Sequence, residues 1–121
     1  MQRKPLPSVL VVEDDPDLTE LLQNALSSAY LVRCVGDVPG ALAFLDKTRP
    51  DLILLDCLLP GGGAADVTAR ARTLACAVVL MSGLPEALEA MAGSGYPGLQ
   101  KPFRMAELMA VLEAACAPHQ G

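Results

Sequence analysis

Aromatic residues are scarce in this chain of 121 residues: they make up 3% of it, and Trp is absent. The hydrophobic core must therefore be aliphatic, and an apolar content of 52% is large enough to build one. Basic residues are also few, with nine against fourteen acidic residues and a net charge of −5. Such an acidic chain is a poor candidate for direct binding to nucleic acid or to an anionic membrane surface.

Long hydrophobic runs are missing as well. The apolar run from Ala75 to Met81, which Leu74 extends by one residue, is far too short to span a membrane. Arg3 and Lys4 precede the apolar stretch Val9–Val12 in a faint likeness to a signal peptide, but that stretch is short and acidic residues stop it. The sequence therefore predicts neither a membrane span nor a secretion signal.

Cysteine pairs and histidine ligands are absent too. The chain has four cysteines and one histidine, and the cysteines form no C-x-x-C motif. Zinc sites require paired spacings and usually histidines, so we expect the cysteines to be four small buried apolar side chains in a reduced, cytoplasmic protein. The cysteines are Cys34, Cys57, Cys76 and Cys116. The single histidine is His119, in the tail.

Apolar strand-like segments alternate five times with amphipathic segments. Buried or alternating apolar patterns predict strands at 8–12, 31–35, 51–56, 77–81 and 99–100. Helical spacing, with Asp15 as the first N-cap, predicts helices at 16–26, 38–45, 64–73, 86–91 and 105–116. This alternation predicts an α/β fold, a doubly wound parallel sheet with helices on both faces. We expect one domain over 1–121, with a core at about 8–117 between short tails.

Polar residues follow the predicted strands. Glu13 and Asp14 come after the first strand, Asp56 ends the third, Ser82 follows the fourth and Lys101 the fifth. The carboxyl ends of parallel strands meet at one edge of a sheet, so these side chains should converge. Clustered carboxylates repel one another unless a cation such as Mg²⁺ joins them. With a lysine and a hydroxyl beside them, these carboxylates form a set of groups suited to phosphoryl transfer to an aspartate.

The segments that carry these residues resemble the four motifs of the response-regulator receiver domain, the CheY-like family. They are Val11–Asp15, Leu54–Pro60, Met81–Gly83 and Lys101–Phe103. The likeness covers nearly the whole chain, and the motifs occur in order at predicted strand ends. It implies a flavodoxin-like sheet with strand order 2-1-3-4-5 and five helices.

The resemblance implies a Mg²⁺ site. Asp14 matches the direct ligand, and Glu13 matches the neighbouring acid that acts through water. Asp56 matches the phosphoacceptor, which also contacts the metal. Leu58 matches the position whose backbone carbonyl binds the ion, so its side chain is not restricted by this role.

The resemblance also implies a phosphoryl-transfer partner. Ser82 and Lys101 match the hydroxyl and the lysine that contact the phosphoryl group. The donor in this family is a phosphohistidine on a sensor histidine kinase or a histidine phosphotransfer protein. Such a domain promotes its own phosphorylation and dephosphorylation and is a phosphoacceptor, not an enzyme acting on a separate substrate. The downstream protein target, the oligomeric state (a homodimer included) and membership of a larger regulator or hybrid kinase stay open.

Two features depart from the usual family pattern. Gly98 stands three positions before Lys101, where an aromatic residue is usual, and the nearby Tyr96 lies two residues earlier. The interval from Ser82 to Lys101 is short, which predicts a shortened fourth-helix region. We therefore expect signalling through a rearranged fourth-helix region. The apolar residues Leu58 and Leu84 additionally predict slow loss of the phosphoryl group.

Two other functions compete with this interpretation. A degenerate or hybrid-kinase-derived receiver could act as a phosphorylation-independent interaction module, but the complete set of five polar residues disfavours it. A hydrolase with a nucleophilic aspartate would need a second acid two residues later to act as the acid–base, and Leu58 occupies that position.

Overall fold

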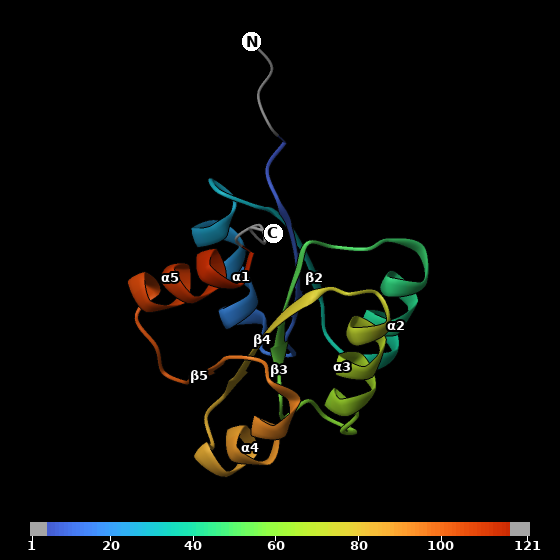
Figure 1. The fold of residues 1–121 in the computed structure, drawn as a ribbon. Helices are drawn as coiled ribbons and strands as arrows, with labels where there is room; N and C mark the ends of the chain where they lie inside the picture. Colours follow the sequence, from blue (N-terminus) through green and yellow to red (C-terminus); the bar gives the residue numbers. More distant parts are fainter. Residues whose placement is uncertain (1–4, 117–121) are drawn as a thin grey trace.

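Five parallel strands form one sheet in the order β2-β1-β3-β4-β5, as the resemblance predicts. Figure 1 shows this computed structural model, which describes residues 5–116. The predicted tail at 118–121 and His119 lie outside the described residues. The strands are β1 (Ser8–Val12), β2 (Leu31–Val35), β3 (Leu52–Asp56), β4 (Ala77–Ser82) and β5 (Gly98–Gln100). The helices are α1 (Pro16–Leu26), α2 (Val38–Lys47), α3 (Ala64–Thr73), α4 (Pro85–Ala90), α5 (Met105–Cys116) and the 3-10 turn η1 (Ala92–Ser94).

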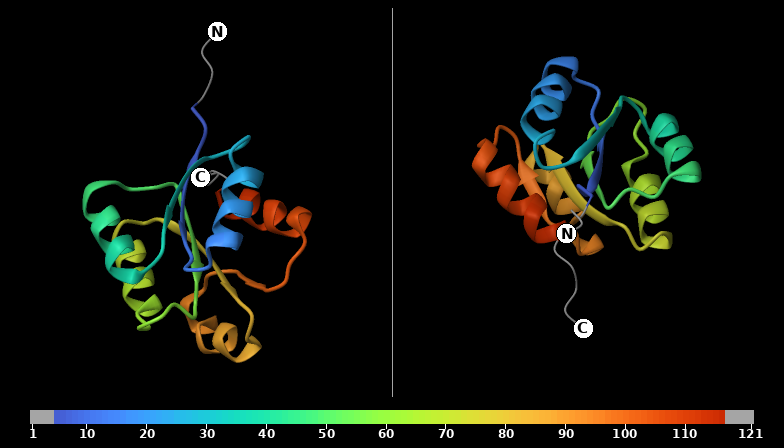
Figure 2. Two further views of the ribbon diagram at one scale, coloured as in Figure 1. Left: turned by 180° about the vertical axis from the view of Figure 1, so that it is seen from behind. Right: turned by 90° about the horizontal axis from the view of Figure 1, so that it is seen from above.

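The helices cover both faces of the sheet, as predicted. Helices α1 and α5 lie on one face, and α2 and α3 lie on the other (Figure 2). Strand β3 is buried along its whole length and supplies alternate residues to the two sides. Leu52 and Leu54 pack with α1 and α5, whereas Ile53 and Leu55 pack with α2 and α3. The aliphatic composition is thus divided between two cores, one on each face.

The predicted element boundaries agree with the structure to within a few residues. Asp15 caps α1 as expected, because its Oδ1 accepts the N–H groups of Asp17 and Leu18. Strand β3 begins one residue later than predicted. Asp51 instead bonds to Ser8: its carboxylate accepts the Ser8 N–H at 2.8 Å, and its own N–H donates to Ser8 Oγ at 3.0 Å. Among the described residues, no helix is long and apolar enough to cross a membrane.

The cysteines are unpaired but not uniformly buried. Cys76 lies in the core, where burial raises the pKa of its thiol to about 11. Cys34, Cys57 and Cys116 are half-buried, so the prediction of four buried side chains is correct only for Cys76.

The fourth-helix region is short, as expected. Helix α4 has 6 residues, none of them buried, and the 3-10 turn η1 follows it. Strand β5 begins at Gly98, one residue earlier than predicted, so this glycine is part of the sheet.

The loop between β3 and α3 contains three consecutive left-handed residues. The φ angles of Gly61, Gly62 and Gly63 are 83°, 72° and 94°. This conformation favours glycine, because other L residues bring Cβ too close to the backbone. Gly63 also lies close to α2: a Cβ there would approach Val38 Cγ1 to 3.1 Å.

Candidate functional site

Strand register brings the predicted site residues to the carboxyl edge of the sheet. Asp56 pairs with Met81, and Ser82 pairs with Gln100. Backbone hydrogen bonds extend this pairing beyond the strands. The Glu13 N–H donates to the Val35 carbonyl at 3.0 Å, and the Lys101 N–H donates to the Ser82 carbonyl at 2.8 Å. The polar residues that follow each strand are therefore positioned by the sheet itself.

Three carboxylates converge at this edge. Glu13, Asp14 and Asp56 each offer an oxygen, and these oxygens lie within 4.8 Å of one another. Glu13 and Asp56 are 3% and 5% exposed, whereas Asp14 is open to solvent. The two buried carboxylates therefore need a positive partner inside the protein.

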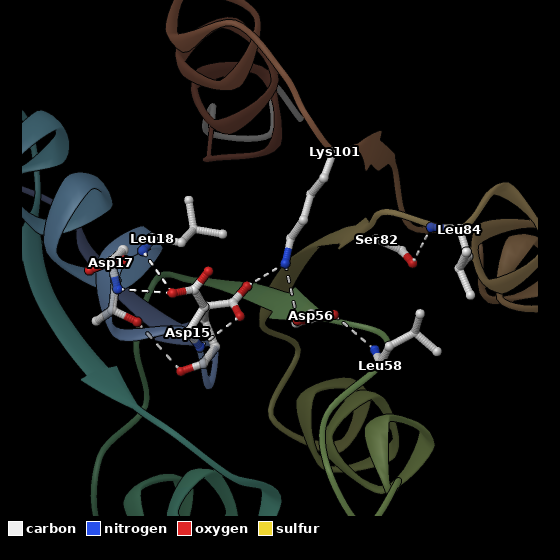
Figure 3. Close-up of polar contacts among 10 residues, drawn as sticks. Asp15, Asp17, Leu18, Asp56, Leu58, Ser82, Leu84 and Lys101 are labelled. Carbon is white, nitrogen blue, oxygen red and sulfur yellow. Dashed lines mark hydrogen bonds and ion pairs between the residues drawn. The ribbon is translucent and has the colours of Figure 1, made fainter.

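Lys101 provides that partner. Its Nζ donates to Glu13 Oε1 at 2.6 Å and to Asp56 Oδ2 at 3.1 Å (Figure 3). Burial acts to lower the pKa of Lys101, but the hydrogen bonds to the two carboxylates outweigh it and raise that pKa. Burial raises the pKa of Glu13, although the bond from Lys101 opposes the change. One lysine among three acids leaves an excess of negative charge at the site.

The donor set fits a hard divalent cation. All three side chains offer carboxylate oxygens, the ligands that Mg²⁺ prefers, and Asp14 leaves the cluster accessible from solvent. Leu58 lies next to this cluster, because its N–H donates to Asp56 Oδ1 at 2.8 Å. The metal-binding role of the Leu58 carbonyl stays a prediction.

Ser82 completes the group of predicted residues. It is fully buried at the end of β4, and its Oγ accepts the N–H of Leu84 at 3.1 Å. Since Oγ accepts this bond, its own proton is free to point toward a phosphoryl oxygen. Figure 3 shows Ser82 and Leu84 on the side of Asp56 away from Asp15.

Two backbone contacts at the site have no counterpart in the sequence analysis. The Asp15 N–H donates to Glu13 Oε2 at 3.1 Å, so the residue that caps α1 also orients a site carboxylate. The Leu84 N–H orients Ser82 in the same way. Backbone donors carry no side-chain pattern, so only the spacing of two residues could have suggested either contact.

An apolar cavity adjoins Lys101. It has a volume of about 410 Å³ and lies between α1 and the segment after β5. Its lining residues are Asp15, Leu18, Leu21, Lys101, Pro102, Phe103 and Met105. The charged site is therefore bordered on this side by an apolar surface.

Comparison of the sequence with known proteins identifies one matching family. The model of the response regulator receiver domain matches residues 9–113. The DNA-binding response regulator MtrA of Mycolicibacterium smegmatis is 34% identical over 111 residues, which cover 88% of this chain and 49% of that protein. The transcriptional regulatory protein TcrA of Mycobacterium tuberculosis is 34% identical over 112 residues, covering 88% and 44% respectively. The chain thus spans about half the length of these curated relatives.

Solved structures agree on the fold. The receiver domain of the Pseudomonas aeruginosa sensor histidine kinase PA1611, with magnesium in its active-site cleft, matches with a TM-score of 0.80 and 28% identity, covering 93% of this chain and 98% of that one. The Vibrio cholerae chemotaxis protein CheY4 matches with a TM-score of 0.79 and 26% identity, covering 92% and 99%.

Proposed function

This chain belongs to the response regulator receiver family of two-component signalling, and from that premise we propose that Asp56 accepts a phosphoryl group from a phosphohistidine in a Mg²⁺-dependent step. One observation carries the proposal: Lys101 bridges two buried carboxylates within a cluster of three. Such a cluster is chemically suited to a divalent cation and a phosphoryl group. The domain acts as a phosphoacceptor rather than as an enzyme that turns over a separate substrate.

Asp56 supplies the nucleophile. One of its carboxylate oxygens forms the new O–P bond while the N–P bond of the phosphohistidine breaks, and the electrons of that bond return to the imidazole ring. The Leu58 N–H holds Oδ1 and Lys101 Nζ holds Oδ2, so the carboxylate is oriented before the donor arrives. Positioning of this kind supplies much of the acceleration in phosphoryl transfer.

Lys101 and Ser82 act on the phosphoryl oxygens. The ammonium of Lys101 forms an ion pair with one phosphoryl oxygen, and the Ser82 hydroxyl donates a hydrogen bond to another. Asp14 and Asp56 would hold Mg²⁺ directly and Glu13 through water, and the ion would neutralise negative charge on the phosphoryl group. The magnesium in the active-site cleft of the Pseudomonas aeruginosa receiver domain supports a magnesium site in this fold.

A sensor histidine kinase or a histidine phosphotransfer protein is the proposed donor. Membership of the receiver family supports this class of partner. The donor approaches the carboxyl edge of the sheet, where Asp56 lies close to solvent-exposed Asp14. MtrA, a DNA-binding response regulator by name, is about twice as long as this chain.

The direct test uses acetyl phosphate, a small phosphoryl donor that needs no partner protein. We expect intact-mass measurement to show one added phosphoryl group when Mg²⁺ is present and none when EDTA replaces it. Labelling that is equally fast in EDTA would contradict the proposed dependence on Mg²⁺. Absence of labelling by both acetyl phosphate and a panel of phosphorylated histidine kinases would contradict the proposed function.

The phosphoryl group on Asp56 is expected to be long-lived. Leu58 and Leu84 lie beside the site and are 48% and 51% exposed, and neither side chain can hydrogen-bond to an attacking water. Leu58→Asn supplies a group that can, so we expect it to speed hydrolysis about tenfold. Decay of the added mass after removal of acetyl phosphate measures both rates.

The control for this measurement is Leu31→Asn. Leu31 is 57% exposed on β2, at the edge of the sheet away from Leu58, so the same change of side chain should leave the rate unaltered. A wild-type half-life of only seconds would contradict the prediction, as would equal rates for the wild type and Leu58→Asn.

A further inference from the structure

The segment from Leu84 to Tyr96 is attached to the rest of the domain at both ends. At its start, the Leu84 N–H donates to Ser82 Oγ at 3.1 Å. Near its end, Arg72 of α3 donates from Nη2 to the Ser94 carbonyl at 3.0 Å. The Arg72 guanidinium also lies over the Tyr96 ring, with Cζ 5.3 Å from the ring centroid. We call the contacts of Arg72 with Ser94 and Tyr96 the clasp.

Hydrogen bonds make the segment continuous between these attachments. The Met91 N–H donates to the carbonyls of Ala87 and Leu88 at 3.3 Å and 3.2 Å, which links α4 to the following turn. Ser94 then donates to the Met91 carbonyl from its N–H at 3.0 Å and from Oγ at 2.6 Å. Unlike the other four α-helices, α4 has no fully buried residue, so less packing opposes a movement of this segment.

Gly98 determines how α4 rests on the sheet. A Cβ at Gly98 would approach Leu88 Cδ2 to 3.1 Å, so the Leu88 side chain packs directly against the backbone of β5. Leu88 thus fills the space in which a larger residue at position 98 would lie. The Tyr96 ring is half-buried against the core on the α2 and α3 side, and Arg72 covers it there.

We propose that the clasp holds the α4–η1 segment in its unphosphorylated position and opens when Asp56 is phosphorylated. The inference rests on the proposed function, since a phosphoryl oxygen must arrive to draw the Ser82 hydroxyl toward Asp56. That movement displaces the Leu84 N–H and with it the start of α4. The clasp yields because it depends on one long, exposed arginine side chain.

Thermodynamic linkage relates the clasp to the affinity of the domain for a phosphoryl analogue, which can be measured. If the closed clasp and the phosphoryl group favour different positions of the segment, weakening the clasp must strengthen binding of a phosphoryl analogue. Beryllofluoride with Mg²⁺ is such an analogue, and its affinity follows from a titration monitored by amide spectra. We expect Arg72→Gln to bind beryllofluoride roughly fivefold more tightly than the wild type, and Tyr96→Leu to change the affinity in the same direction.

Two control variants test the specificity of the effect. Arg70→Gln removes an arginine from the same helix, but Arg70 pairs with Asp46 and does not contact the clasp. Tyr96→Phe keeps the aromatic ring under the guanidinium. Both variants should bind beryllofluoride with wild-type affinity, and a tighter affinity in Arg70→Gln equal to that in Arg72→Gln would overturn the proposal.

The amide spectra separate this inference from the proposed function. Shifts at Cys57 and Leu58 report beryllofluoride on Asp56, and shifts at Ser94, Gly95 and Tyr96 report the clasp. Changes in both groups, with tighter binding by Arg72→Gln, support the proposal. Changes at Cys57 and Leu58 alone, or unaltered affinity in Arg72→Gln, overturn the clasp and leave phosphorylation standing. Absence of changes in both groups overturns the proposed function and the clasp together.

Discussion

Replacing Asp56 by asparagine is expected to abolish phosphoryl incorporation from acetyl phosphate while leaving the fold intact. The amide cannot form the O–P bond, and in the described residues the only other clustered carboxylates are those of Glu13 and Asp14. Glu13 is held by Lys101 and by the Asp15 N–H and is assigned to the metal site, and Asp14 is exposed to solvent, so we expect neither to replace Asp56 as the acceptor. We expect the added mass to fall to background in the variant.

The stability of Asp56→Asn provides an internal check. Asparagine keeps an oxygen that can accept from Lys101 or from the Leu58 N–H, and it removes one negative charge from the cluster. The midpoint of thermal unfolding should therefore be no lower than that of the wild type. Asp66→Asn, an exposed change in the first turn of α3, is the matched control and should be labelled normally. Persistent labelling of Asp56→Asn would place the phosphoryl group on another residue.

Lys101→Met is expected to have the largest effect on stability. The Lys101 ammonium is the hydrogen-bond partner of two carboxylates whose side chains are 1% and 7% exposed, those of Glu13 and Asp56. Removal of one partner from a buried charge pair costs about 3 kcal/mol, which corresponds to a fall of roughly 10 °C in the midpoint of thermal unfolding. Differential scanning calorimetry in EDTA measures the change.

Mg²⁺ should reverse much of this loss. A cation that binds only the folded protein raises its stability, and the three carboxylates bind it more tightly once Lys101 no longer competes for them. The increase in midpoint on adding Mg²⁺ should therefore be larger in Lys101→Met than in the wild type. Lys47→Met, at an exposed lysine in the last turn of α2, is the control and should resemble the wild type in both solutions. A wild-type midpoint for Lys101→Met in EDTA would contradict the role given to this lysine.

The sequence was sufficient to predict the fold and the convergence of the site, because both follow from strand patterns. Parallel strands place their carboxyl ends at one edge, so the positions of Glu13, Asp56 and Lys101 after separate apolar segments already imply their proximity. The short interval before Lys101 likewise predicted a short α4. These properties depend on local sequence and on rules of topology.

Contacts that depend on backbone atoms or on distant side chains were not predictable. The bond from Leu84 to Ser82 uses a backbone N–H, and any residue at position 84 other than proline could donate it. Arg72 and Tyr96 are separated by the whole of β4, α4 and η1, and their contact depends on how far the end of α3 lies from the turn after η1. The partial burial of Cys34, Cys57 and Cys116 depends on helix placement in the same way.

The loop between β3 and α3 ends in three residues whose backbone conformation suits D-amino acids. Gly61, Gly62 and Gly63 all adopt positive φ, the region in which D-amino acids are comfortable and L-amino acids are strained. A D-alanine introduced at Gly61 or Gly62 by chemical synthesis would suit these φ angles and would restrict the unfolded chain. At Gly63 an L side chain would also meet Val38, because its Cβ would approach Val38 Cγ1 to 3.1 Å. Natural substitutions in this loop are thus limited by chirality at two positions and by chirality and space at the third.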